Sequence, residues 1–153
     1  MSFDARLTEL GISLPGPYPP HDPLDAVVIH GGVARTSGQL PRDEAGNLVH
    51  PGRLGADLTV EQGTEAARWC ALNALSVLRA ELGSLDRIER VLTVLGFVAC
   101  TPDFLAQPAV VDGASRLLAE VFGGAGRHSR SAIGVAALPR GGAVEIEVAV
   151  ALG

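Results

Sequence analysis

Apolar side chains recur every three or four residues in two stretches of the chain, which is the spacing of an amphipathic helix. The first stretch opens with Thr59 and Gln62, whose order has the form of a helix-capping box, and it ends at Gly83. The second opens near Pro108, because proline is favoured in the first turn of a helix, and it ends at Gly123. We therefore predict two helices, over residues 59–83 and 108–122.

Five shorter stretches are rich in β-branched residues or alternate apolar with polar residues, and they predict strands. Gly31 and Gly32 separate the first two and supply the positive φ angles of a tight hairpin turn. In the last stretch, Glu145 and Glu147 alternate with valine and isoleucine, so one face is apolar and the other is acidic. The predicted strands cover residues 25–30, 33–40, 87–99, 131–138 and 143–152.

The order of these elements predicts one α+β domain over residues 25–153, with a mixed sheet and both helices packed on one face. Residues 1–24 contain five closely spaced prolines, which disfavour helix and central strand. We expect this segment to be a proline-rich arm or lid outside the core. The second face of the sheet has no predicted cover, and a further copy of the chain in closed symmetry would cover it most simply.

The turn at residues 139–142 is expected to close a tight hairpin between the last two strands. Ala136 would then pair with Glu145, and Arg130 would lie six residues further along the strand. At about 3.4 Å per residue, that places Arg130 roughly 20 Å from Glu145. A small-molecule site that uses both side chains would therefore have to draw them from different chains.

The composition narrows the classes of function. The 12 basic residues are all arginines, so catalysis through a lysine Schiff base is excluded. The net charge of -5 argues against a nucleic-acid partner, because phosphate binding needs clustered cations. With 47% hydrophobic and 19% charged residues, the chain is apolar enough to bury surface between subunits.

Cysteine and histidine show no metal-binding or redox pattern. Cys70 and Cys100 lack CxxC spacing and are expected to be small buried apolar residues. The four histidines are scattered and form no HExxH pair, so no metal is expected. Ser37 is not in the GxSxG motif of a nucleophile elbow. No signal peptide or membrane span is recognised, so we expect a cytoplasmic protein with no membrane partner.

Two candidates for chemistry remain, and each is a weak signal alone. Arg130 follows a glycine-rich loop, and Glu145 lies on the acidic face of the last predicted strand. Charged residues at such places are usually solvated. In combination, however, TSGQLP at residues 36–41 and the run from Arg130 through Leu138-Pro139 to VEIE at residues 144–147 resemble the signature of the RidA/YjgF family.

The resemblance extends over residues 25–152. The runs VDGAS at residues 111–115 and GRHSR at residues 126–130 also resemble a branch of the family that carries an extended N-terminal segment. The resemblance implies a chorismate-mutase-like fold and a homotrimer. It also implies cofactor-independent hydrolysis of reactive imines and enamines, such as 2-aminoacrylate, to 2-oxo acids and ammonia.

Site residues follow from the resemblance by motif. Arg130 would bind the substrate carboxylate, which suits its planar fork. Glu145 would orient or deprotonate the attacking water. Ser37 and Gly38 would line the pocket.

Three positions depart from the family pattern. Asp112 stands in place of a family asparagine, and its charge would weaken carboxylate binding or favour an amino-bearing substrate. Ala132 stands where many relatives have cysteine, so only its backbone amide is left to bind substrate. Ungapped counting puts Leu24 at the family tyrosine position, and Tyr18 serves only if about six residues loop out.

We keep three functional hypotheses. The first is an imine/enamine deaminase acting on a small carboxylate at a trimer interface. The second is a trimer that binds a small carboxylate without turnover, as a sensor or chaperone-like partner. The third is the endoribonuclease activity also associated with the family, which the acidic, lysine-free chain disfavours.

Overall fold

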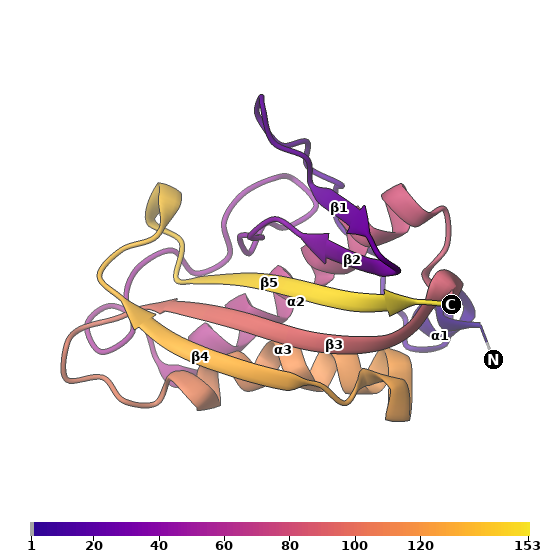
Figure 1. Ribbon diagram of the computed structural model, residues 1–153. Helices are drawn as coiled ribbons and strands as arrows, with labels where there is room; N and C mark the ends of the chain where they lie inside the picture. Colours follow the sequence, from indigo (N-terminus) through magenta and orange to yellow (C-terminus); the bar gives the residue numbers. More distant parts are fainter. Residues whose placement is uncertain (1) are drawn as a thin grey trace.

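The computed structural model describes residues 2–153 and has an α+β fold, as predicted. Five strands form one mixed sheet in the order β1-β2-β5-β3-β4, and the two long helices, α2 and α3, lie behind it in Figure 1. The elements are α1 (Phe3–Glu9), β1 (Val27–His30), β2 (Val33–Thr36), α2 (Val60–Leu82), η1 (Leu85–Arg87), β3 (Ile88–Ala99), α3 (Gln107–Phe122), η2 (Gly123–Gly126), β4 (Ser129–Val135), η3 (Pro139–Gly141) and β5 (Val144–Leu152).

The predicted boundary signals of the helices are confirmed. The Thr59 hydroxyl accepts from the backbone N–H of Gln62, and the Gln62 side chain accepts from the backbone N–H of Thr59, at 3.2 and 3.0 Å. Gly83 ends α2 in the left-handed region with φ 83°, which glycine adopts without steric cost. Pro108 lies in the first turn of α3.

Apolar and acidic side chains alternate along β5, and this alternation decides which face of the sheet packs against the helices. Val144, Ile146, Val148 and Val150 are buried, whereas Glu145 and Glu147 are half-buried. Each fully buried valine or isoleucine contributes about 1.5–3 kcal/mol through removal of apolar surface from water. The helix-facing side of β5 is therefore held in the core, and the two glutamates lie on the opposite face.

The expected hairpin between the last two strands is wrong. β4 pairs in parallel with β3, and β5 pairs antiparallel with β3, so β3 lies between them. Two features explain the difference. Helix α3 makes the connection from β3 to β4 a crossover, which joins parallel neighbours, and residues 136–143 are long enough to pass the end of β3.

The expectation that residues 1–24 form an irregular arm outside the core is also wrong for the first part of this segment, which contains α1. The prolines begin only at residue 15, so residues before them are free to form α1. The Ser2 hydroxyl caps this helix by accepting from Ala5, and Leu7 is 2% exposed within the core.

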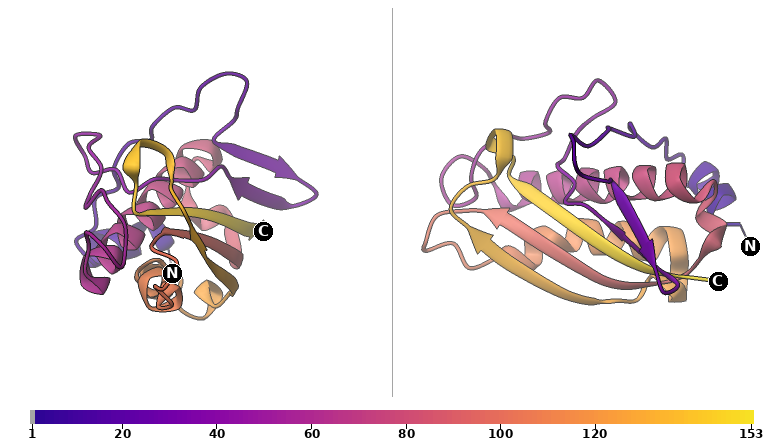
Figure 2. Two further views of the ribbon diagram at one scale, coloured as in Figure 1. Left: turned by 90° about the vertical axis from the view of Figure 1, so that its left-hand side faces the viewer. Right: turned by 45° about the horizontal axis from the view of Figure 1, so that its top comes forward.

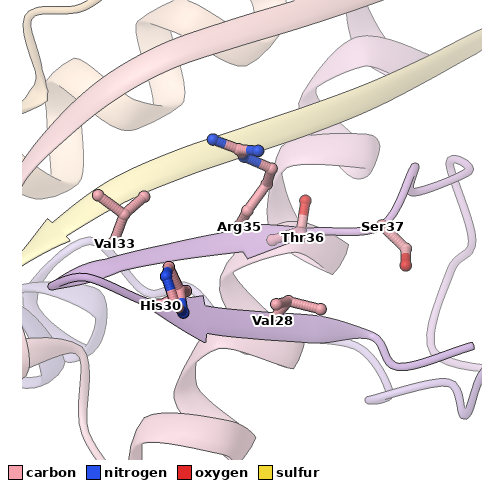
Figure 3. A pocket seen from close by; sticks show the side chains of 6 residues that line it. All are labelled: Val28, His30, Val33, Arg35, Thr36 and Ser37. Carbon is pink, nitrogen blue, oxygen red and sulfur yellow. The ribbon is translucent and has the colours of Figure 1, made fainter.

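One face of the sheet carries no helix, as the edge-on view in Figure 2 shows. On this open face Val28 is 56% exposed and Ile133 is 43% exposed. A cavity of about 430 Å³ lies on the β1–β2 part of it. Figure 3 shows side chains that line this cavity, among which Arg35 points toward β5. An uncovered face with exposed apolar side chains of this kind is typical of an interface. No helix within residues 2–153 is long and apolar enough to cross a membrane.

Candidate functional site

Glu145 lies on the open face of β5 next to Gly38. The segment after β2 is held there by two backbone hydrogen bonds between Gln39 and Ile146, at 2.9 and 3.0 Å. A Cβ atom on Gly38 would lie 2.8 Å from the carboxyl carbon and from one carboxyl oxygen of Glu145. The Glu145 carboxyl can occupy this position because Gly38 has no side chain.

Four of the expected site residues line one cavity of about 440 Å³: Tyr18, Ser37, Gly38 and Glu145. Leu24, the alternative to Tyr18, lines the same cavity. The Tyr18 hydroxyl donates to the backbone carbonyl of Asp43, and the Ser37 hydroxyl donates to that of Asp25 at 2.7 Å.

Cationic side chains also border this cavity. Arg42 and Arg140 line it together with Glu145. The Arg42 guanidinium carbon lies 5.5 Å from the centre of the Tyr18 ring, within the range of a cation–π contact. The ring of Tyr18 is thus held against the loop that carries Arg42.

Burial raises the pKa of Glu145, and the neighbouring charge of Glu147 raises it further. Both effects disfavour the charged carboxylate. The shift brings this carboxyl closer to the range in which one group both accepts and returns a proton near neutral pH.

We expect Glu145→Gln to become more stable, relative to the parent, as the pH rises. Below the ordinary pKa near 4.5, Glu145 is protonated in both the folded and the unfolded chain. As the pH rises through the raised folded-state pKa, the parent loses stability, because ionisation is penalised only in the fold. Urea unfolding at pH 4 and pH 8 measures the difference.

Glu44→Gln, at an exposed loop position, is the control and is expected to show no comparable change. A stability gap for Glu145→Gln that stays constant between the two pH values would contradict a desolvated Glu145.

Arg130 belongs to a different part of the chain. Its partner in the sheet is Val94 of β3, whose buried side chain faces the helices, so Arg130 also points to the helix side. There its Nη1 donates to Asp112 Oδ1 at 2.8 Å and to the Ser115 hydroxyl at 3.2 Å. Its Nη2 donates to the Pro108 carbonyl at 3.3 Å. The side chain is 21% exposed.

Asp112 and Arg130 are therefore brought together as expected, and Ala132 lies on the same side of β4, beside Gly96. The charge of Asp112 is shared, since its second oxygen lies 3.7 Å from Arg116. The three groups together carry one net positive charge, so the negative charge expected to oppose an anion is offset.

Two residues of this cluster were missed in the sequence. The Ser115 hydroxyl lies 2.9 Å from His128 Nε2, and His128 Nδ1 lies 2.6 Å from the Gly126 carbonyl. The sequence spacing of Ser115 and His128 from Asp112 and Arg130 could have identified them. Asp112 and Ser115 are three apart on a helix, and His128 and Arg130 are two apart at the start of a strand, so each pair shares a face.

The site residues thus form two groups that do not meet within one chain. Glu145 pairs with Phe97, and Phe97 pairs with Ile133, three residues from Arg130. Two strand spacings of about 4.8 Å and three residues at about 3.3 Å separate the Cα atoms by about 14 Å. The gap is smaller than the roughly 20 Å expected from a hairpin, but the two side chains point to opposite faces of the sheet.

Among residues 2–153 no group of three or more histidine, cysteine, aspartate or glutamate side chains is arranged to hold a metal ion. Cys70 is buried, and burial raises the pKa of its thiol, which keeps it in the unreactive protonated form.

Comparisons with known proteins agree with this fold. A family model described as "YjgF/chorismate mutase-like, putative endoribonuclease" matches residues 4–146. Because the match begins at residue 4, an extension preceding the family domain is not evident, contrary to our expectation. Protein TCP17 of Trypanosoma cruzi is 46% identical over 97% of this chain and 92% of its own length.

Two solved structures are similar over nearly the whole chain. Protein Atu1372 of Agrobacterium tumefaciens, of unknown function, is 39% identical with a TM-score of 0.89, over 99% of this chain and 92% of that one. A "putative endoribonuclease" of Shewanella oneidensis is 34% identical with a TM-score of 0.94, over 99% of this chain and 100% of that one.

Proposed function

Because this chain belongs to the YjgF/chorismate mutase-like family, we propose that it is a Rid-type enzyme that hydrolyses reactive imines and enamines to 2-oxo acids and ammonia. The substrates are of the 2-aminoacrylate type, and no cofactor takes part. The half-buried Glu145 carboxyl, in a cavity against Gly38, is the observation that carries this proposal.

The complete site lies between two copies of the chain in a homotrimer. One copy supplies the group around Arg130, and the next supplies the cavity with Glu145. The support for this arrangement is the placement of the two groups on opposite faces of one sheet, together with the exposed apolar side chains on the open face where Glu145 lies.

The reaction needs one carboxylate anchor and one group that moves protons. Arg130 holds the substrate carboxylate through two charge-assisted hydrogen bonds. Glu145 takes a proton from water as the water oxygen bonds to the imine carbon. Glu145 returns this proton to the nitrogen, which gives a carbinolamine. It then moves the hydroxyl proton of the carbinolamine to the nitrogen as the carbon–nitrogen bond breaks, so that the carbonyl forms and ammonia leaves.

Glu145→Gln is expected to abolish the acceleration of imine hydrolysis while the fold persists. Glutamine has the size of glutamate but accepts no proton, and loss of a general base lowers kcat about 100-fold or more. The assay generates short-lived imines from several amino acids with an amino-acid oxidase and follows ammonia release with and without the protein.

Glu44→Gln is the control, because Glu44 is exposed and lies outside the cavity of Glu145. It is expected to keep most of the activity. Binding of a 2-oxo acid by the parent without any acceleration would instead favour a non-catalytic carboxylate-binding protein. Equal rates with and without the parent, and no binding, would reject both.

A further inference from the structure

A chain of hydrogen bonds runs from the Gly126 carbonyl through His128 and Ser115 to Arg130, and the donor of each bond can be assigned. The Gly126 carbonyl only accepts, so the contact of 2.6 Å with His128 Nδ1 selects the tautomer that has its ring hydrogen on Nδ1. His128 Nε2 therefore accepts, and the Ser115 hydroxyl donates to it at 2.9 Å. With its hydrogen committed, the Ser115 oxygen accepts from Arg130 Nη1 at 3.2 Å.

The side-chain contacts of Arg130 with Asp112 and Ser115 are both made by Nη1. Nη1 has two hydrogens, and Asp112 and Ser115 take both. Nη2 gives one hydrogen to the Pro108 carbonyl. Within residues 2–153, the Nε hydrogen and the second Nη2 hydrogen of Arg130 bind no acceptor. Two such donors are what a carboxylate needs for a two-bond contact.

Asp112 is itself a carboxylate and competes for these donors. Only its Oδ1 is bonded to Arg130, at 2.8 Å, while its Oδ2 has a 3.7 Å contact with Arg116, whose side chain is 69% exposed. If the guanidinium rotated so that a second nitrogen faced Oδ2, both oxygens of Asp112 would bind Arg130. That two-bond pair would take donors that a ligand needs.

We propose that Ser115, oriented by His128, is a positioning residue that prevents Arg130 from closing a two-bond pair with Asp112. By holding Nη1, the serine leaves the remaining guanidinium donors to the carboxylate of the ligand. The inference rests on the proposed role of Arg130 as the carboxylate anchor. It explains how this chain carries an aspartate at position 112 and still binds an anion.

The test measures the dissociation constant of pyruvate by calorimetry, without relying on turnover. Ser115→Ala is expected to weaken binding about tenfold, the size of effect that follows when a hydrogen bond to a charged group is lost. Ser115→Thr keeps the hydroxyl and is expected to stay within about threefold of the parent. His128→Leu, which frees the serine hydroxyl, is expected to fall between them.

A double-mutant cycle with Asp112→Asn separates this role from simple loss of a contact. An asparagine forms no charged pair with Arg130, so Asp112→Asn alone is expected to tighten pyruvate binding. In that background Ser115→Ala is expected to cost less than about twofold. Thermal unfolding of each variant verifies that the fold persists.

Two results would overturn the inference: Ser115→Ala binding like the parent, or Ser115→Ala weakening binding equally in the parent and in the Asp112→Asn background. Arg130→Lys is measured alongside. If it binds pyruvate as tightly as the parent, the carboxylate anchor and the proposed function fail as well. If it loses binding while Ser115→Ala does not, only the positioning role fails.

Discussion

Arg130→Lys is expected to lower kcat/KM for 2-imino acids about 10- to 100-fold, because a point charge replaces a fork that makes two charge-assisted hydrogen bonds. Stability should hardly change. Lysine keeps the positive charge beside Asp112, and the pair is partly exposed, with side-chain exposures of 21% and 40%. Such a pair contributes at most about 1 kcal/mol. Initial rates and urea unfolding measure the two effects.

Arg116→Lys is the matched control for this prediction. Arg116 contacts the same aspartate, at 3.7 Å, but its side chain is 69% exposed and it is not the proposed anchor. Its activity is expected to stay close to that of the parent. Parent-like affinity of Arg130→Lys for 2-oxo acids would show that Arg130 is not the carboxylate anchor.

Co-refolding Arg130→Ala with Glu145→Ala is expected to restore activity that neither variant has alone. Each variant lacks one half of every site, so each homotrimer is inactive. A mixed interface works where the intact Arg130 of one chain meets the intact Glu145 of the other. Random assembly of equal amounts gives about a quarter of the sites this composition. Ammonia release by the mixture, compared with the sum of the separate variants, measures it.

Differently tagged variants verify that mixed trimers form, and co-refolded parent with Glu145→Ala is the reference for refolding yield. Mixed trimers without activity would mean that the site is not shared or that Glu145 takes no part in the chemistry. Restored activity does not require a hairpin between the last two strands. It depends on the opposite directions in which Arg130 and Glu145 point from the sheet.

Local features of the chain were predicted well because they depend on neighbours in sequence. Thr59 and Gln62 cap a helix, and Gly31 and Gly32 turn a hairpin, whatever the rest of the fold does. The alternation along β5 likewise separates its apolar face from Glu145 and Glu147. Helix α1 was missed because the prolines that follow it dominated the composition of the segment.

Strand order and the partners of Arg130 were decided only by the tertiary structure. The turn chemistry at residues 139–142 is compatible with a hairpin, and only the pairing of β3 with both β4 and β5 excludes it. The contacts of Arg130 depend on the packing of α3 against β4, which brings Ser115 and His128 together across 13 positions. The identity of the candidate site residues and the local geometry of helix caps, turns and strand faces could therefore be predicted from the sequence. The direction in which each site residue points could not, because register and strand neighbours arise from packing across the whole sheet.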